Sequence, residues 1–480
     1  MPSIMWFRET DIRMHDNTAL SASCDQSQSV IGIFFITPET WAVHNIAPCR
    51  IQLMLRGLQL LEKNLASRNI PLFIYKILSY KEIPNIILDL ANTFHVQHVF
   101  ANKQYEINEL QRDQLVCSLL SSHEKKLHCL DDQSILKPNQ LKTGKGEYYT
   151  VFTPYKKAWV KHVLDNPIIS LPVPEKKQTF ETNNYQHPNL IKEISSTEIE
   201  QFNSAVDPDL WPAGEKHALK MLDTFLDENI NKYKSTRDYP ILDKTSKLSA
   251  YLATGMLSAR VCFLQAKSAN DNKIIDGNTE VDCWISELIW RDFYKQILIS
   301  FPRVCKDRAF KQETDKLVWH NNNEHFEAWK NGQTGFPLVD AAMRQLKKTG
   351  WMHNRLRMLT AMFLSKFLWL DWRKGEAYFM QHLIDGDFAS NNGGWQWSAS
   401  TGTDAAPYFR IFNPTTQSER FDSDGAFIKK YCPELASLDK KTIHNPYVYA
   451  PEKAKKLDYP KPIIDYKSTR AYAIEQFKAL

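Results

Sequence analysis

The continuous apolar run Val30-Ile31-Gly32-Ile33-Phe34-Phe35-Ile36 has the composition of a strand buried on both faces of a parallel sheet. Three more short apolar runs precede residue 130, at 4–7, 71–77 and 95–101. Between the runs, apolar residues are spaced by three and four over 49–69, 82–94 and 104–120. This alternation predicts an α/β domain with a doubly wound parallel sheet, because right-handed βαβ crossovers place helices on both faces.

The predicted sheet domain lacks the glycine-rich loops that usually bind nucleotide phosphates. Neither G-x-G-x-x-G nor G-x-x-x-x-G-K-[ST] occurs there. We therefore do not expect a dinucleotide in this part of the chain.

The rest of the chain has a different periodicity. Residues 165–201 are polar and contain several prolines, which is typical of a surface connection. From Trp211 to Leu383 the apolar spacing is helical, most clearly over 284–300 and 356–370. We expect three regions: an α/β domain over 1–135, a linker over 136–205 and a larger all-α domain over 206–475.

Composition indicates a soluble globular protein, with 43% hydrophobic and 24% charged residues in 480. The first sixteen residues include five charges, and their one apolar run, 4–7, is too short for the core of a signal peptide, so we expect none. No stretch offers the roughly 20 consecutive apolar residues of a membrane helix, and a cytoplasmic location is expected. The eight cysteines are scattered without C-x-x-C pairs, which predicts reduced thiols and no metal site.

Basic residues are concentrated in one region although the net charge is only +5. Residues 341–370 contain six basic side chains and no acidic one. Such a strip suits a polyanion such as nucleic acid. A solvated helix face explains the same pattern equally well.

Aromatic and polar residues are interleaved in the second half of the chain. Nine of the thirteen tryptophans fall between Trp284 and Trp397. Core filling is the ordinary explanation for one tryptophan, but a group of them can also stack on flat ligands or pass single electrons. Residues 385–397 combine carboxylates, amides, glycines and indoles, which favours a site for a large, polar, aromatic ligand. The hydroxyls of 245–249 suit phosphate oxygens or simple helix caps.

Several segments, in order along the chain, resemble the photolyase/cryptochrome family, most closely its bacterial class I cyclobutane-dimer photolyases with a folate antenna. The segments are Trp6-Phe7-Arg8 with 11–17, Ser286-Glu287-Leu288-Ile289-Trp290-Arg291-Asp292, Gly350-Trp351-Met352-His353-Asn354-Arg355-Leu356-Arg357-Met358, 385–397 and 403–414. The resemblance implies light-driven repair of DNA by a carbon–carbon lyase, acting as a monomer on cyclobutane pyrimidine dimers in double- or single-stranded DNA.

The resemblance also implies a reduced FAD in a U-shaped conformation within the helical domain. The matching FAD positions are Tyr233, Thr245, Ser246, Lys247, Leu248, Ser249, Trp284, Arg291, Asn354, Arg357, Asp385, Asp387 and Asn391. Among these, Arg357 and Asp385 match an ion pair beside the isoalloxazine, and Asn391 matches the residue that faces flavin N5. Plant-type cryptochromes carry Asp at the last position, so Asn391 favours repair over signalling.

The implied catalytic residues are Glu287 and Asn391, and the implied electron relay consists of Trp395, Trp372 and Trp319. The implied lesion and DNA contacts are Glu287, Trp290, Asn354, Arg355, Met358, Trp397, Arg410 and Arg420. Outside its motif, Glu287 would be an ordinary surface salt-bridge former. Arg410 is as well explained by a buried carboxylate partner as by a phosphate contact.

The resemblance further implies 5,10-methenyltetrahydrofolate as an antenna. Its matching positions are His44, Asn108, Glu109, Cys305 and Lys306. Dimer repair has three alternatives. A cryptochrome-type photoreceptor often has a long C-terminal extension, a (6-4) photolyase has histidines in its lesion pocket, and a flavin dehydrogenase needs a substrate site that the motifs lack.

Overall fold

The computed structural model describes residues 1–182 and 185–480, and the chain divides into two compact units. The first unit consists of Met1–Ser204, Trp211–Asn231 and Ser246–Pro302. The second consists of Ala205–Leu210, Lys232–Thr245 and Arg303–Leu480. The first unit thus combines segments from both sides of residue 205, and the domain boundaries at 135 and 205 stay predictions.

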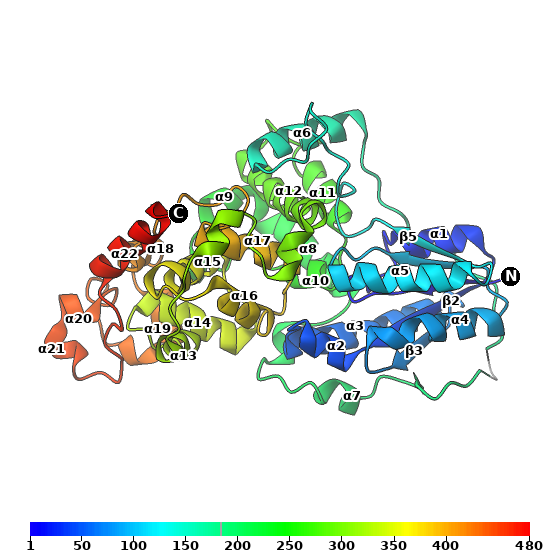
Figure 1. Ribbon diagram of the computed structural model, residues 1–480, viewed down its shortest axis with the longest axis horizontal. Coiled ribbons are helices and arrows are strands. Elements are labelled where there is room, and N and C mark those ends of the chain that lie inside the picture. The colour runs from blue at the N-terminus through cyan, green and yellow to red at the C-terminus, as the bar shows by residue number, and fades with distance from the viewer. Residues whose placement is uncertain (183–184) are drawn as a thin grey trace. The chain divides into compact units, whose positions relative to one another are not determined.

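The first unit contains the predicted doubly wound sheet (Figure 1). Its strands are β1 (Ser3–Trp6), β2 (Val30–Ile36), β3 (Leu72–Lys76), β4 (His98–Asn102), β5 (Lys126–Leu130) and β6 (Leu190–Ile191). The strand order is β5-β4-β1-β2-β3-β6, and the first five strands are parallel. The short edge strand β6 pairs antiparallel with β3 and falls in the predicted linker. Strand β5 was not predicted, because its sequence Lys-Leu-His-Cys-Leu is not a continuous apolar run.

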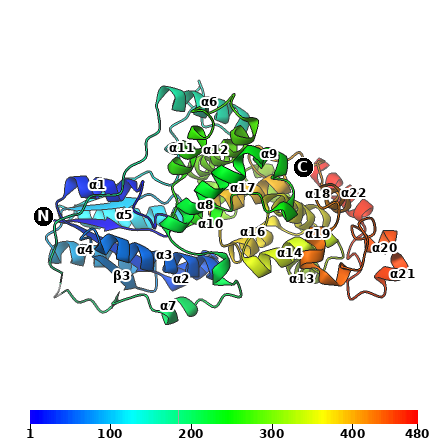
Figure 2. The same cartoon turned by 180° about the vertical axis from the view of Figure 1, so that it is seen from behind.

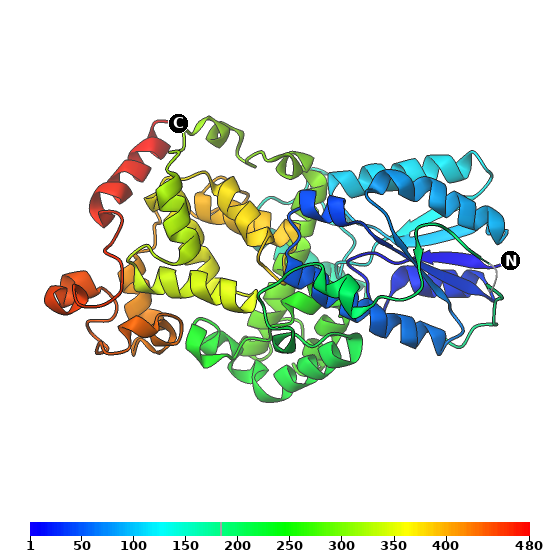
Figure 3. The same cartoon turned by 90° about the horizontal axis from the view of Figure 1, so that it is seen from below.

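Helices cover both faces of this sheet (Figure 3). The helices associated with it are α1 (Thr18–Gln26), α2 (Pro38–Val43), α3 (Pro48–Ala66), α4 (Ile83–Thr93), α5 (Ile107–Ser121) and α7 (Ser196–Glu200). Helices α4 and α5 pack against each other, and their apolar residues share one buried cluster with β1 to β5. The helix spacings over 49–69, 82–94 and 104–120 therefore correspond to α3, α4 and α5.

Among the residues that the structure describes, the first unit contains five further α-helices. They are α6 (Phe152–Asp165), α8 (Glu215–Glu228), α10 (Ser249–Ala253), α11 (Ala259–Ser268) and α12 (Thr279–Ser300). Figure 2 shows α6 and α11 beside α12, and both helices contact it. Helix α6 lies within the segment 136–205, which is predicted to be a linker. Its buried Tyr155, Trp159 and Val163 have the helical spacing that predicts such a segment.

The second unit is helical, as predicted. Its helices are α9 (Tyr233–Thr236), α13 (Asn323–Asn331), α14 (Pro337–Thr349), α15 (Asn354–Met362), α16 (Trp372–Met380), α17 (Phe388–Ala399), α18 (Pro414–Phe421), α19 (Ala426–Tyr431), α20 (Pro446–Tyr449), α21 (Pro451–Ala454) and α22 (Tyr466–Lys478). A π-helical turn, η7 (Phe363–Phe367), continues α15. The predicted helix over 356–370 therefore changes its winding after Met362. The buried core joins α14, α15, η7, α16, α17 and α19.

Two further expectations concern the cysteines and membrane-spanning helices. All eight cysteines are free thiols, which agrees with their scattered spacing. Within residues 1–182 and 185–480, the helices lack the combination of length and apolar content that a bilayer crossing requires.

A buried charge network connects the segment that follows β1 with helix α11, more than 240 residues later in the chain. Asp132 accepts from Arg13 Nη2 at 2.6 Å and from Arg260 Nη2 at 2.9 Å, and Arg260 also pairs with Asp16 at 3.0 Å. Burial opposes ionisation of Asp132, but the two guanidinium groups outweigh it and hold its pKa well below its usual range. The carboxylate therefore stabilises the folded state above its unfolded pKa, and that contribution is lost as the pH falls.

We expect Asp132→Asn to lower the free energy of unfolding by about 3–5 kcal/mol, because it leaves two buried guanidinium groups without their carboxylate. The neighbouring Asp131→Asn is the matched control. Asp131 pairs with the half-exposed Lys103 at 3.1 Å and accepts from the hydroxyl of the buried Tyr105 at 3.1 Å, so its loss should be smaller, about 1–2 kcal/mol. Thermal and denaturant unfolding near neutral pH measure both values. Equal losses in the two variants would contradict a special role for the Asp132 network.

Candidate functional site

The predicted site residues are divided between the two units. The first unit carries His44, Asn108, Glu109, Ser246, Lys247, Leu248, Ser249, Trp284, Glu287, Trp290 and Arg291. The second carries Tyr233, Thr245, Cys305, Lys306, Trp319, Asn354, Arg355, Arg357, Met358, Trp372, Asp385, Asp387, Asn391, Trp395, Trp397, Arg410 and Arg420. The richest cluster of polar groups therefore belongs to the second unit, on and between α15, α16 and α17.

Helix α15 positions the cation of the cluster. His353 caps the helix through Nδ1, which accepts from Arg355 N at 3.2 Å. One turn later, Arg357 Nη2 donates to both carboxylate oxygens of Asp385, at 2.8 and 3.1 Å. Arg357 Nε also donates to Met352 O at 2.8 Å, which fixes the guanidinium plane. The structure thus brings together the predicted ion pair, with the Asp385 carboxylate almost fully buried.

Helix α17 positions the second carboxylate and the amide. Asp387 is its N-cap, and its side chain accepts from Ser390 N at 2.9 Å. Asn391 follows one turn later and donates from Nδ2 to Glu376 O at 3.1 Å. Because a single backbone acceptor holds this amide, Asn391 has a defined orientation beside the ion pair.

Glu376 is a member of this cluster that the sequence analysis missed. Its carboxyl group is buried and accepts from Asn392 Nδ2 at 2.9 Å. Burial raises the pKa of Glu376 to about 7. The preceding residues, Arg373-Lys374-Gly375, have the composition of an exposed helix face, so nothing in the local sequence marks Glu376 as a buried acid.

A cavity of about 140 Å³ opens among these side chains. Its lining residues are Asn354, Arg357, Met358, Ala361, Phe379, Leu383, Asp385, Asp387, Ser390, Asn391, Gly394 and Trp395. The indole Nε1 of Trp395 is buried and has no hydrogen-bond partner among the described residues. Apolar walls with a few converging charged and amide groups suit a flat ring with a polar edge. The residues present therefore fit an isoalloxazine ring.

The predicted electron relay runs from buried to partly exposed side chains. Trp395 and Trp372 are buried, whereas Trp319 is partly exposed. Trp395 packs directly on α16, because a Cβ atom at Gly375 would lie only 2.1 Å from its ring. Trp329 lies edge-on to Trp395 with centroids 6.1 Å apart, and it donates its indole N–H to Thr360 O. Trp329 is fully buried, which fits a packing role.

Helix α12 carries the predicted lesion residues of the first unit, Glu287 and Trp290. Together with Trp284, a predicted FAD contact, they recur every third residue, which places them on one side of the helix. Trp290 stacks on Phe152 with ring centroids 3.6 Å apart and an interplanar angle of 6°. Arg291, a predicted FAD contact, donates to the backbone carbonyls of Gln133 and Leu252. Its FAD contact and the role of Glu287 stay predictions.

The predicted phosphate-binding arginines of the second unit differ in their environments. Arg355 pairs with Asp238 at 2.8 Å and lies over the Phe421 ring at 4.5 Å. Arg410 and Arg420 are exposed. Arg410 and Arg420 are therefore better placed than Arg355 to contact a polyanion. All three contacts stay predictions.

Three of the five predicted antenna residues meet in the first unit. His44 approaches Asn108 Nδ2 at 2.9 Å through Nε2 and Glu109 Oε1 at 3.3 Å through Nδ1. Tyr80 donates to the same Glu109 oxygen at 3.2 Å. Burial raises the pKa of Glu109 to about 7, and its other oxygen has no hydrogen-bond partner among the described residues. A buried acceptor beside an amide fits the hydrogen-bonding edge of a pterin.

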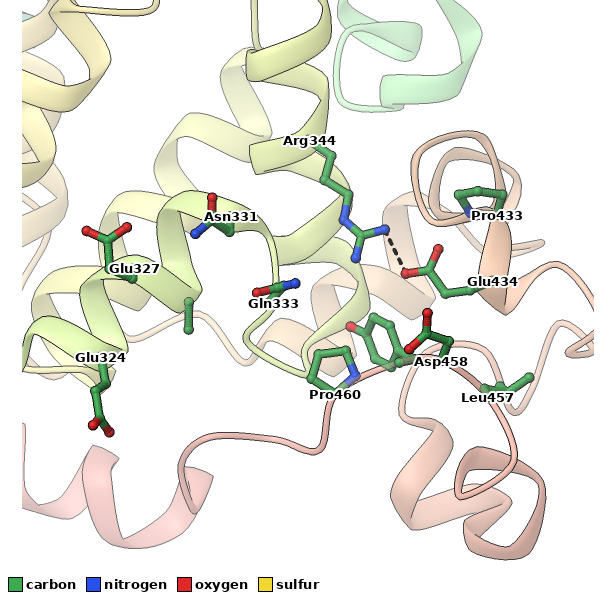
Figure 4. Close-up of a pocket in the computed structure, with 12 residues that line it drawn as sticks. Glu324, Glu327, Asn331, Gln333, Arg344, Pro433, Glu434, Leu457, Asp458 and Pro460 are labelled. Atoms are coloured by element: carbon green, nitrogen blue, oxygen red, sulfur yellow. Dashed lines mark hydrogen bonds and ion pairs between the residues drawn. The ribbon is translucent and has the colours of Figure 1, made fainter.

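A larger open cavity of about 760 Å³ lies elsewhere in the second unit (Figure 4). Four acidic side chains line it: Glu324, Glu327, Glu434 and Asp458. Its one arginine, Arg344, points toward Glu434 and pairs with it at 2.7 Å. An acidic lining repels phosphate groups, so this cavity suits neither DNA nor a dinucleotide.

Comparison with known proteins identifies the family. The profile described as "DNA photolyase" matches residues 3–177, and "FAD binding domain of DNA photolyase" matches residues 284–479. A deoxyribodipyrimidine photo-lyase of Escherichia coli is 42% identical, with 99% of this chain and 98% of that protein covered. The corresponding protein of Salmonella typhimurium is also 42% identical, with 100% and 99% covered.

Solved structures give the same result. A class III photolyase of Agrobacterium tumefaciens superposes with a TM-score of 0.84 at 31% identity, covering 100% of this chain and 97% of that one. A cryptochrome of Synechocystis gives 0.87 at 26% identity, with 99% and 98% covered. The sheet, the helical unit and the match to an FAD-binding domain over residues 284–479 define an FAD-binding flavoprotein enzyme. More particularly, the chain belongs to the photolyase/cryptochrome family.

The buried acid Glu376 should make stability depend on pH in an unusual direction. Its folded pKa of about 7 exceeds the ordinary value of 4.5, so the folded state holds the proton more tightly than the unfolded chain. Wild-type protein should therefore lose about 2–3 kcal/mol of stability, relative to Glu376→Gln, as the pH rises from about 4.5 to about 7.

Chemical denaturation of both proteins across this pH range measures the difference. Glu327→Gln, which replaces an exposed glutamate, is the control and should follow the wild-type profile. A constant difference between wild type and Glu376→Gln across this pH range would show that the pKa of Glu376 is not raised in the folded protein.

Proposed function

We propose that this protein is a deoxyribodipyrimidine photo-lyase that binds UV-damaged DNA, flips out a cyclobutane pyrimidine dimer and splits it with light. The observation that carries the proposal is the full-length similarity to proteins of that name at 42% identity. The polar cavity beside α15 and α17 supports it, since the chemistry needs a flavin.

Reduced FAD, once bound and excited by light, supplies the single electron that no side chain can donate at the required potential. The residues that would hold its ring are Arg357, Asp385, Asp387 and Asn391. The charges of Arg357 and Asp385 cancel, so the pair can orient polar ring atoms without adding net charge to the site. Tyr233 and the hydroxyl side chains of 245–249 would hold the phosphates, and the buried Thr245 Oγ1 has no partner among the described residues.

The protein's own side chains would present the lesion. A damaged pair costs less to unstack than a sound one, which favours flipping of the dimer. Trp290 and Trp397 would stack on the dimer, with Met358 as a further apolar contact. Glu287 and Asn354 would hydrogen-bond the base edges, and Glu287 would stabilise negative charge on the dimer after electron transfer.

The remaining residues have supporting roles in the proposal. Exposed Arg410 and Arg420, and less directly Arg355, would contact phosphates with little sequence preference. Trp395, Trp372 and Trp319 would carry electrons toward an oxidised flavin to restore its reduced state. The protein would work as a monomer in the cytoplasm, with the DNA substrate held by the helical domain.

Blue-light signalling without repair is the alternative. The Synechocystis cryptochrome supports it only through fold and 26% identity. Repair is favoured because the named photo-lyases are far more similar over the same length, and because an amide, Asn391, stands where plant-type cryptochromes carry a carboxylate.

The antenna would be methenyltetrahydrofolate. His44, Asn108 and Glu109 would bind its pterin edge, and the buried Glu109 oxygen without a partner supports a donor there. Cys305 and Lys306 would complete the site.

The lesion pocket is tested by Trp290→Ala combined with Glu287→Ala. Trp290→Ala alone should weaken binding to dimer-containing DNA by about 1–3 kcal/mol, since one base-stacking face is lost. The double variant should lose light-driven repair while it retains FAD. Dimer loss is assayed under blue light with pre-reduced enzyme.

The control is Glu280→Ala, which replaces a glutamate two turns earlier on the same helix α12. It should bind and repair like wild type. Full repair by the double variant, with FAD bound, would exclude these two residues from the pocket.

The antenna site is tested by Asn108→Ala and Glu109→Gln after reconstitution with methenyltetrahydrofolate. Both variants should lose the bound folate, measured by absorption, and keep their FAD and their repair rate per photon absorbed by flavin. Asn64→Ala, an exposed asparagine of α3, is the matched control. Undiminished folate binding by both site variants would place the antenna elsewhere.

A further inference from the structure

A row of aromatic rings leads from Trp319 to the last helix of the chain. The ring centroids of Trp319 and Trp369 are 4.7 Å apart. The Trp369 ring in turn meets the Tyr472 ring edge-on at 5.6 Å. Trp369 is 1% exposed, whereas Tyr472, on α22, is 36% exposed. The three rings therefore form a continuous path that ends at solvent.

We propose that Trp369 and Tyr472 extend the electron relay beyond Trp319, with Tyr472 as the terminal electron donor and His320 as the acceptor of its proton. The inference rests on the proposed relay that reaches Trp319. It adds a terminal electron donor that the three-tryptophan relay does not contain.

The backbone and side chain of Trp369 are held in an unusual position. Its φ of 50° lies in the left-handed region, which a bulky residue seldom adopts. Its indole N–H donates to Val318 O at 2.8 Å, and its own carbonyl accepts from His320 N at 2.8 Å. Surrounding contacts thus enforce a conformation that is unfavourable by itself, as is common at functional positions. The carbonyl dipole of Val318 also stabilises positive charge on the indole.

Tyr472 has a suitable partner for its proton. His320 Nε2 lies 3.2 Å from the Tyr472 hydroxyl, and their rings are 5.2 Å apart. With the imidazole neutral and Nε2 unprotonated, the phenol donates this hydrogen bond. A phenol that loses an electron becomes a strong acid, so a nearby base makes Tyr472 easier to oxidise.

The steps balance as single-electron transfers. The oxidant is the light-excited oxidised flavin, which draws one electron through the relay and leaves Trp319 as a radical cation. Trp319 takes an electron from Trp369, and Trp369 takes one from Tyr472. Tyr472 loses its phenolic proton to His320 Nε2, so the products are a neutral tyrosyl radical and a protonated imidazole. A soluble thiolate then gives one electron to the tyrosyl radical and becomes a thiyl radical, and the proton on His320 Nε2 returns to the Tyr472 oxygen.

Packing alone gives a different expectation. Trp369 shares a small buried cluster with Ala473 and Phe477, and Tyr408 stacks on the same Phe477 at 5.8 Å. If these rings only hold α22 in place, Tyr408 and Tyr472 are equivalent and neither is oxidised. If the path conducts, only the tyrosine in contact with Trp369 and His320 is oxidised.

The test is flash excitation of the holoenzyme with oxidised FAD, followed by transient absorption and freeze-quench EPR of protein radicals. Wild type should show a tryptophan radical that is replaced by a tyrosyl radical. Tyr472→Phe should lose the tyrosyl signal and keep the tryptophan signal. Trp369→Phe should lose the tyrosyl signal and show faster decay of the remaining radical. His320→Gln should diminish tyrosyl formation without a change in packing.

Tyr408→Phe is the matched control and should behave as wild type. Repair by pre-reduced enzyme does not use this path, so each variant should keep it, which separates this inference from the proposed function. A tryptophan radical in wild type without any tyrosyl radical would overturn the extension and leave the relay intact. Absence of every tryptophan radical would overturn both.

Discussion

The close approach of α16 to α17 at Gly375 is the constraint on which the candidate site depends. The Trp395 ring occupies the space that any side chain at position 375 would need. Glycine inside a helix costs about 1 kcal/mol relative to alanine, and here the close contact offsets that cost. The contact buries the indole against the helix that begins at Trp372. It also brings Glu376 within hydrogen-bond distance of the two asparagines of α17.

The positions of α16 and α17 determine where the charged groups of the site lie. The short connection between them carries Asp385 and Asp387, and Arg357 of α15 closes over the first of these carboxylates. Burial of an isolated charge would be very unfavourable. The second unit solves this problem in two ways, by pairing Asp385 with Arg357 and by raising the pKa of Glu376 so that it can hold a proton. The result is a cavity with charged and amide groups on one side and apolar side chains on the other.

Parts of this architecture could be predicted from the sequence, and the omissions have physical reasons. The strands that are buried on both faces, such as Val30–Ile36, consist of continuous apolar residues and were identified. Strand β5 exposes part of its length at a sheet edge, so its polar residues hide it. Helix α6 lies within the predicted linker, although its apolar spacing is helical, and the prolines that follow it are typical of a surface connection.

The candidate site could likewise be predicted only in part. Family motifs located Arg357, Asp385 and Asn391, and the structure brings them together. Glu376 escaped notice because burial, which makes it unusual, depends on helix packing rather than on neighbouring residues. The ion pair between Arg355 and Asp238 was also not predictable, since its partners are far apart in sequence and belong to no periodic pattern.

The most direct test of the central claim uses the wild-type holoenzyme with fully reduced FAD and DNA that carries cyclobutane pyrimidine dimers. Dimers are quantified after incubation under blue light and in darkness. The account predicts dimer loss in the light and none in the dark. No loss in the light, with reduced FAD and DNA both bound, would contradict it.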